Sequence, residues 1–323
     1  MRPISPKLLI CALPLAFAGC VEGELTYLLN PDGSGKVNID VVMPATPTFI
    51  RSSPGGETLK TPTDHLAKIR KEFVQSILKS SRGVTAWEDV SVNFKPDGRI
   101  HFKGIAYFQD ASRLKIQTIP APVPLLRKSG GKLRLTFKKD GDDAGRKSPR
   151  TVAQSKLDPR KLSGKMLDQY VRLERVKYQQ SKGLLLAFLT GLDLKSSFRV
   201  PGPVSSVQGF ERPKADTVSL RLEGRQVIEE IDRIMSKSDR ELGAYVKEHG
   251  AIVSSMNNGP PGQDLSPLFH KLSTAAAVVD KPKGPLFDFS AAVERARSKY
   301  PQLRKQLDVP DLKLPGNRSD DGN

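Results

Sequence analysis

Short segments of alternating apolar residues, joined by tight Asp-Gly turns, are the feature that most restricts the fold of this chain. Val37, Ile39 and Val41 recur at every second position, as they do in a strand whose side chains point alternately to its two faces. An Asp-Gly pair supplies the positive φ that a tight hairpin turn needs. The alternating segments are 37–41, 90–94, 100–108, 133–137, 194–200 and 218–222, with Asp-Gly turns at 32–33, 97–98 and 140–141, and a short apolar segment, Leu25 to Leu29, precedes the first turn. The sequence therefore predicts antiparallel hairpins with one buried face.

A helix is expected at residues 63–81, where Leu66, Ile69 and Phe73 recur at helical spacing and Gly83 follows the end. Its charged residues leave one apolar stripe, so we expect the helix to lie against the sheet. The predicted fold class is α+β: a largely antiparallel sheet of β-hairpins with one face covered by helices, plus C-terminal helices and a disordered tail.

Composition and turn residues divide the chain into four parts. The tail is rich in Pro, Gly and polar residues, which favours disorder, although one short helix is expected at 290–300. The predicted parts are a signal peptide (1–19), an α+β domain (20–223) with a basic loop at about 127–165, a helical region (224–256) and a mostly disordered tail (257–323).

The first twenty residues predict export. Arg2 and Lys7 precede an eleven-residue apolar run, Leu8 to Ala18, which is shorter than the roughly 20 residues that cross a hydrocarbon core. Its length and flanks are typical of a signal peptide. The run ends in Leu-Ala-Phe-Ala-Gly-Cys, which resembles the bacterial lipobox and predicts cleavage before Cys20 and lipid on its thiol. An ordinary secretory signal with a chance cysteine and a retained membrane helix are the alternatives.

The two cysteines support this interpretation. Cys11 would leave with the leader and Cys20 would carry the lipid, so the mature chain would keep no thiol for a disulfide, a metal or a nucleophile. Such a chain has to fold around its apolar core alone. The expected location is the cell envelope, on the outer face of a bacterial membrane.

The positive charge is concentrated in one segment. The chain carries a formal charge of +17, and residues 127–182 hold seventeen Lys or Arg against six Asp or Glu. A lipid-anchored segment of this kind would reach anionic lipid heads or an acidic envelope polymer, and a solvated loop is the alternative. Nucleic acid is not an expected partner, because the chain is exported and has no zinc-ligand spacing or helix-turn-helix signal.

No catalytic, cofactor-binding or metal-binding residue is predicted; the one predicted site residue is Cys20, for lipidation. Residues 30–36 (Asn-Pro-Asp-Gly-Ser-Gly-Lys) lack the features of a phosphate loop or an EF-hand, and a hairpin turn explains them. The histidines have no tight ligand spacing, and adjacent carboxylates such as Glu88-Asp89 diverge, so we expect solvated surface. The four histidines are His65, His101, His249 and His270.

Several of these features together resemble the LppM-like lipoproteins, a loosely defined family of lipid-anchored envelope proteins. The resemblance covers about residues 20–225 and implies an α+β domain with an antiparallel sheet, and contact with lipid or a partner instead of catalysis. The basic insertion and the C-terminal helices depart from the family pattern. The residues that carry the resemblance are Cys20, the hairpin around Asp32-Gly33-Ser34-Gly35, Val90 to Phe108 with its Asp97-Gly98 turn, and Phe198 to Val204 followed by Val218 to Leu222.

The predicted function is that of a membrane-anchored envelope lipoprotein that binds or supports other molecules without catalysis. One alternative is a lipid-handling lipoprotein with an apolar cavity between helix and sheet. A second is an envelope hydrolase whose residues converge only in space, which a deep pocket joining a histidine to a carboxylate would favour.

Overall fold

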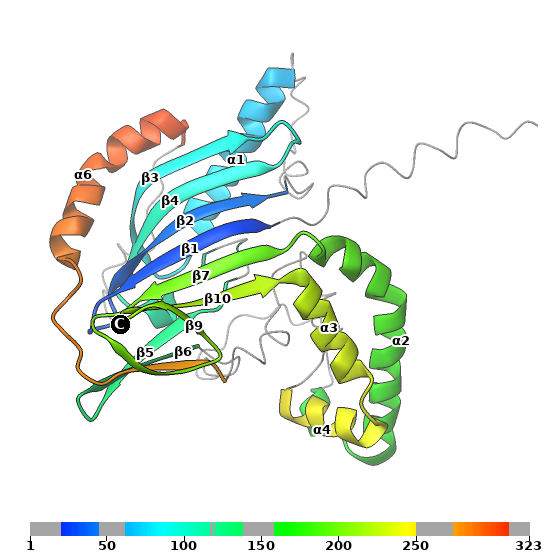
Figure 1. The fold of residues 1–323 in the computed structure, drawn as a ribbon. Helices are drawn as coiled ribbons and strands as arrows, with labels where there is room; N and C mark the ends of the chain where they lie inside the picture. Colours follow the sequence, from blue (N-terminus) through cyan, green and yellow to red (C-terminus); the bar gives the residue numbers. More distant parts are fainter. Residues whose placement is uncertain are drawn as a thin grey trace, which may run out of the picture.

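The computed structural model describes residues 21–44, 62–116, 119, 121–137, 158–249 and 274–309. Within these residues the chain forms two β-sheets and several helices (Figure 1). Strand pairs are antiparallel with one exception, so the predicted α+β class with a largely antiparallel sheet is confirmed. The strands form two sheets instead of the single one expected.

The larger sheet has seven strands in the order β3-β4-β2-β1-β7-β10-β9. Its hairpins β1–β2 and β3–β4 are those that the Asp-Gly turns predict, and Gly33 and Gly98 both have positive φ. The exception to antiparallel pairing is β1 with β7, where Tyr27 is paired with Phe198. The strand bounds are β1 Glu22–Leu29, β2 Gly35–Met43, β3 Val84–Phe94, β4 Ile100–Phe108, β7 Asp193–Arg199, β9 Glu211–Lys214 and β10 Thr217–Glu223.

The smaller sheet has the order β5-β6-β11-β8 and joins the larger one through aromatic side chains. Phe137 and Phe198 pack edge to ring at 5.7 Å, and Phe198 stacks on Tyr27 at 4.7 Å. Hairpin β5–β6 occupies the start of the segment expected as a basic loop, and residues 138–157 of that segment lie outside the described part. The strand bounds are β5 Pro124–Ser129, β6 Lys132–Phe137, β8 Val204–Gln208 and β11 Ala276–Val279.

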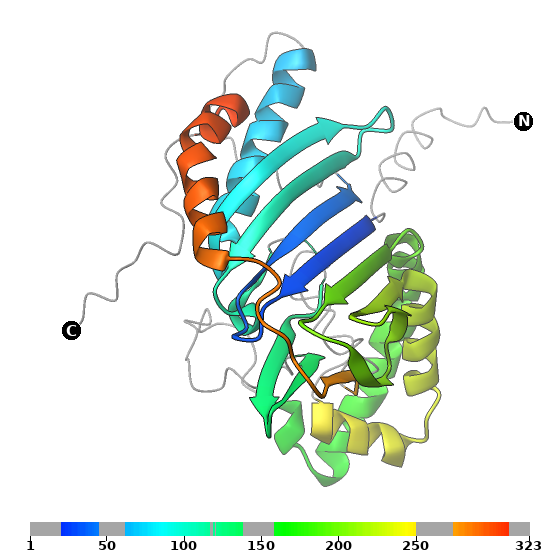
Figure 2. The ribbon, with the colours of Figure 1, turned by 60° about the vertical axis from the view of Figure 1, so that its left-hand side comes forward.

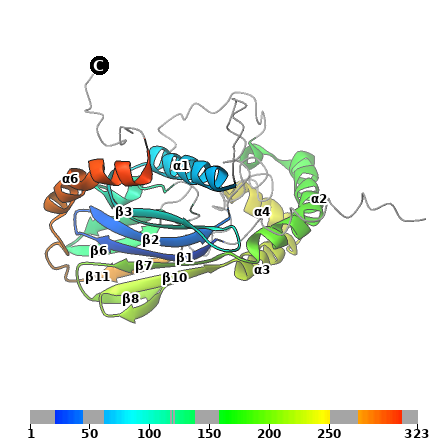
Figure 3. The same ribbon diagram turned by 90° about the horizontal axis from the view of Figure 1, so that it is seen from above.

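Helix α1 (Pro62–Ser80) confirms the helix predicted at 63–81 and covers the inner face of the larger sheet (Figure 3). Phe73 packs edge to ring on Phe102 at 6.1 Å, and both side chains are fully buried. These rings fill the part of the helix–sheet interface in which an apolar cavity was considered.

Three helices lie beyond one end of the larger sheet, the end at which β1 begins (Figures 1 and 3). The Tyr178 hydroxyl donates to Asp232 at 2.8 Å and fastens α2 to α3. Ser238 and Glu241 form a capping box at the start of α4, because each backbone amide donates to the side chain of the other residue. The bounds are α2 Gly164–Leu189, α3 Gly224–Met235 and α4 Asp239–His249, with short 3-10 turns at Ala111–Arg113 and Pro159–Lys161.

Residues 274–309 contain more structure than the expected tail with one short helix. They form β11, inside the smaller sheet, and helix α6 (Phe289–Leu307), which is longer than the predicted 290–300 and runs along edge strand β3 (Figure 2). The carboxylate of Asp288 caps the helix by accepting from the Ala291 amide at 3.0 Å. Burial against the sheet supplies the stability that the polar composition of this segment does not indicate.

The two halves of helix α6 pack against different parts of the body. Its first half buries Ala292, Val293 and Ala296 against a small apolar cluster on the outer face of the larger sheet. Its second half sends Leu303 and Leu307 into the main core. Pro301, which lies between the two halves, cannot donate a helical hydrogen bond, so the helix can bend there around the edge strand.

Candidate functional site

The described residues form an open hollow of about 1010 Å³ at the end of the larger sheet, where the β1–β2 turn meets the start of α6. This end is opposite to the one at which β1 begins. Polar side chains dominate its lining. The lining residues are Asn30, Asp32, Ser34, Thr85, Gln109, Pro285, Phe287, Asp288, Phe289, Ser290, Val293, Glu294 and Arg297.

Asn30 builds one wall of the hollow by joining two distant parts of the chain. Its side-chain oxygen accepts from the Leu286 amide at 2.8 Å, and its nitrogen donates to the Phe287 carbonyl at 3.2 Å. The same nitrogen donates to the Ser34 hydroxyl, which in turn donates to Asp32 at 2.7 Å. Asn30 is almost fully buried. These groups are therefore occupied in shaping the turn and in holding the segment before α6.

The charged side chains that line the rest of the hollow are mostly acidic. Asp32, Asp288 and Glu294 outnumber Arg297 there, so the hollow is acidic although the chain is basic. Histidine and cysteine do not line it, and its serines have no base beside them of the kind that activates a nucleophile. Among the described residues, no group of three His, Cys, Asp or Glu side chains is placed to hold a metal ion. The hollow suits a polar or positively charged group.

Glu88 lies under α6 close to this hollow and is a buried carboxylate that sequence reasoning assigned to solvated surface. The Tyr107 hydroxyl donates to it at 2.6 Å and the Lys299 ammonium donates at 2.9 Å. Burial, the largest single effect, opposes its ionisation, but the bonds from Tyr107 and Lys299 outweigh burial and lower the pKa of Glu88. Burial and the bond to Glu88 raise the pKa of Tyr107 to about 12.

The expectation of a solvated Glu88 is wrong because α6, distant in sequence, covers the outer face of the sheet at this point. Asp89, its neighbour, is exposed and has a positive φ of 51°, and a register shift lies between Glu88 and Ser91. A β-bulge of this kind re-aims side chains and ends regular pairing. Here it keeps Glu88 on the face that α6 covers while Trp87 points into the core.

One histidine meets a carboxylate among the described side chains. His101 Nε2 lies 2.6 Å from Asp40 Oδ1, and the Lys103 ammonium lies 2.8 Å from the other oxygen. Burial opposes the ionisation of Asp40, but its bonds to Lys103 and His101 outweigh it and lower the pKa of this carboxyl. The pair lies on the outer face of the sheet and not in the hollow, so it does not form the deep pocket that a hydrolase would need. The side chains of His65, His249 and His270 lie outside the described part.

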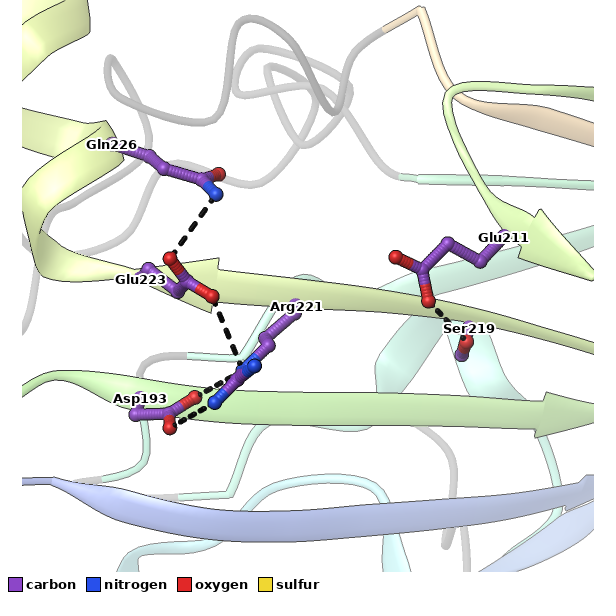
Figure 4. A network of polar contacts seen from close by, with 6 residues as sticks. All are labelled: Asp193, Glu211, Ser219, Arg221, Glu223 and Gln226. Atoms are coloured by element: carbon purple, nitrogen blue, oxygen red, sulfur yellow. Dashed lines mark hydrogen bonds and ion pairs between the residues drawn. The ribbon is translucent and has the colours of Figure 1, made fainter. Parts of the chain in front are cut away.

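A second polar network lies on the outer face near the start of β1 (Figure 4). Arg221 donates to both oxygens of Asp193, at 2.7 and 2.6 Å, and also lies 3.3 Å from Glu223. The hydrogen bond from Arg221 lowers the pKa of Asp193. Gln226, on α3, donates to Glu223 at 3.2 Å. Arg221 thus joins a carboxylate of β7 to one of β10, and Gln226 connects α3 to the same network.

The predicted lipidation site, Cys20, lies just outside the described residues, and its neighbour Val21 is the first residue placed. Val21 packs against the core, and its carbonyl accepts from the Asp193 amide at 2.9 Å. The end of α2 lies close by, because β7 begins at Asp193, four residues after Leu189. A lipid on Cys20 would therefore be attached one residue away from the folded body.

Comparisons with known proteins give one weak match. No family model matches the chain, and no curated protein matches it. The LppM protein folded domain of Mycobacterium tuberculosis, solved by NMR, is 13% identical; the alignment covers 64% of this chain and 85% of that domain, with a TM-score of 0.26. This is a weak likeness to the family that the sequence resembles. At this TM-score it carries no argument about function, and the proposals below rest on the residues of this chain.

Proposed function

We propose that this chain is a lipoprotein of the bacterial envelope, held on the outer face of a membrane by lipid on Cys20, and that it acts as a binding or structural protein. The leader carries the proposal: a charged start, a short apolar run and small residues before a cysteine. Two or more acyl chains on one cysteine give an effectively permanent anchor, since each buried methylene contributes about 0.8 kcal/mol. In the described residues, no helix has the length and apolarity needed to cross a membrane.

The position of Val21 supports this proposal. A residue that follows an acylated cysteine has to leave the membrane surface directly, and Val21 leads into β1, the central strand of the larger sheet. The body would then be oriented by its tether. The ends of α2 and β10 would face the membrane, and the acidic hollow would lie about 25 Å away, the length of an eight-residue strand.

The side chains of the hollow and of the outer sheet face favour a binding role over catalysis. The hollow offers carboxylates and amides without a nucleophile or a histidine, and the pair of His101 and Asp40 lies on an open face. A protein that holds an acidic hollow away from the membrane can present it to a polar or cationic group in the envelope. The lipid-handling alternative would need a cavity where Phe73 and Phe102 now fill the core.

The decisive experiment is intact-mass analysis of the full chain expressed in a bacterium with lipoprotein-processing enzymes. The expected species begins at Cys20 and carries diacylglyceryl or triacyl mass. Cys20→Ser should abolish the added mass and release the protein from the membrane fraction. Cys11→Ser is the matched control, because it changes the leader cysteine that is not acylated, and it should leave the modification intact. A retained Met1, or a processed terminus without fatty acid, would refute the proposal.

We also propose that the basic segment, residues 127–182, contacts anionic lipid heads or an acidic envelope polymer. Each Lys or Arg near an anionic surface contributes about 1 kcal/mol, within a Debye length of about 8 Å. The unlipidated Cys20→Ser chain should bind vesicles that contain phosphatidylglycerol and should be released as salt is raised. Equal binding to phosphatidylcholine vesicles would rule out this contact.

A further inference from the structure

The outward face of α2 carries an apolar stripe that the fold leaves exposed. Met166, Leu173 and Val176 are 55%, 47% and 52% exposed. They stand seven and three residues apart, a spacing that puts them on one side of a helix. Single exposed apolar residues are ordinary, but three on one side of one helix, with Gln169 exposed among them, form an apolar stripe.

The opposite side of α2 is fixed to the body. Val171 and Tyr178 are buried, Tyr178 and Lys182 both bond to Asp232 on α3, and Arg175 bonds to the carbonyl of Lys237. These contacts determine how the helix is rotated about its axis. The stripe therefore points away from α3 and α4, and it cannot turn inward without breaking them.

The charges that flank the stripe are mostly basic. Lys165 and Arg172 each precede a stripe residue and are exposed. Of the acidic residues of α2, Glu174 is fully buried, and Asp168 is exposed between Lys165 and Arg172 on the same side of the helix, where the two cations outnumber it. A helix with apolar residues on one side, flanked by Lys and Arg, is the type that lies in the headgroup region of an anionic bilayer.

The position of α2 in the fold selects a membrane over other occupants. The helix lies across the end of the larger sheet at which β1 begins, and Figures 1 and 3 both place it outermost there. Its last turn is held at that end by Leu189, whose carbonyl lies against Gly224, and by the pairing of Glu22 with Asp193. A tether on Cys20 would thus bring this side of the body to the lipid surface.

We infer that α2 is an interfacial helix that lies flat on an anionic membrane, with Met166, Leu173 and Val176 in the headgroup region and Lys165 and Arg172 on lipid phosphates. The inference rests on the proposed anchor for the side that faces the membrane. It goes beyond the anchor because it gives the body a fixed orientation. Lipid would hold the protein, and α2 would prevent it from pivoting.

The test places a fluorescent reporter on the stripe of the full-length, processed protein. An acylated Cys20 leaves no other thiol in the mature chain, so Leu173→Cys gives a single site for an environment-sensitive label. In vesicles of phosphatidylglycerol and phosphatidylcholine, we expect a blue shift of its emission and quenching by brominated lipid. Asn38→Cys is the control, because it is exposed on β2 and lies away from α2, so its label should stay in water.

The second part of the experiment introduces a negative charge into the stripe. In the Leu173→Cys protein, Val176→Glu should remove the blue shift, whereas Asn38→Glu, which adds the same charge on β2 away from α2, should retain it. Both positions are exposed, so neither substitution should alter thermal unfolding. In phosphatidylcholine vesicles the shift should be weaker, because the flanking cations lose their partners.

The outcomes separate the inference from the anchor. A lipidated protein that floats with anionic vesicles while its Leu173 label stays in water would overturn the inference and leave the anchor standing. If intact mass shows no lipid on Cys20, the label is placed on Leu173→Cys in a chain that also carries Cys11→Ser and Cys20→Ser; its entry into the bilayer would support the inference while the anchor is overturned. A blue shift that appears without vesicles and grows with protein concentration would show that a second copy covers α2, and would overturn the inference.

Discussion

The carboxylate of Glu88 on β3 lies 2.9 Å from the ammonium of Lys299 on α6, although 211 positions separate the two residues in sequence. The Glu88 side chain is 8% exposed and the Lys299 side chain is 53% exposed. With the bond from Tyr107, this contact anchors the helix that covers the edge of the larger sheet. It makes the attachment of α6 dependent on pH.

Glu88→Gln should lower the free energy of unfolding by about 1–3 kcal/mol at neutral pH, because it removes a buried charge with two charge-assisted bonds. The pKa of Glu88 is lower in the folded protein than its ordinary value of 4.5, so its stabilisation is present above that value. It is lost as pH falls through the folded pKa. Urea unfolding at pH 7 and pH 3 measures this: the difference from wild type should shrink at pH 3. An equal difference at both values, or an equal effect of Glu294→Gln on α6, would contradict it.

Gly224→Ala should destabilise the helical end of the molecule. A Cβ at position 224 would come within 1.6 Å of the Leu189 carbonyl oxygen, a backbone atom, so the two chain segments would have to separate. Overpacking of this kind costs about 1–3 kcal/mol or more. Gly183→Ala in α2 is the control: its Cβ would meet open space, and it should stabilise the helix by about 0.5–1 kcal/mol. Thermal melts that rank the two variants in the opposite order would refute this account.

Asn30→Ala should loosen the segment before α6 without unfolding the sheet. The substitution removes the acceptor of the Leu286 amide and the donor to the Phe287 carbonyl, at a cost of about 1–3 kcal/mol. Hydrogen exchange by NMR or mass spectrometry should show faster exchange at residues 286–289 and little change in β3 and β4. The control is Asn38→Ala, on an exposed position of β2. Uniform acceleration throughout the protein would mean that Asn30 supports the whole fold.

Phe198→Ala should reduce stability by about 3–5 kcal/mol, the range for the loss of a buried phenylalanine. This ring contacts Tyr27, Phe137 and Phe210, so it joins the larger sheet to the smaller one. Val176→Ala, on the exposed face of α2, should change stability by less than about 0.5 kcal/mol. Chemical denaturation of both variants provides the comparison. A small effect of Phe198→Ala would show that the two sheets fold independently.

Local patterns predicted the elements whose signals lie within a few neighbouring residues. Alternation and Asp-Gly turns predicted the β1–β2 and β3–β4 hairpins, and helical spacing predicted α1 to within a residue at each end. Strand β11 was not expected. Its four residues are too few to show a period, and its pairing with β6 and β8 depends on chain segments far away.

The candidate sites also differ in whether neighbouring or distant residues form them. The leader and Cys20 are read from contiguous residues, and their chemistry remains a prediction for intact-mass analysis. The acidic hollow could not be foreseen, because Asn30 and Phe287 approach each other across 257 positions. Capping of a helix by Asp288 was a local signal that could have indicated where α6 begins.

Local patterns in the sequence were enough to predict the hairpins and the covering helix, and they predict export, because periodicity, turn chemistry and a leader act over short distances. Tertiary structure alone decided that Glu88 is buried, that the strands divide into two sheets and that α2 lies across the end at which β1 begins. These outcomes depend on which apolar surfaces meet in space. The free energy of that burial is shared among residues that no local pattern connects.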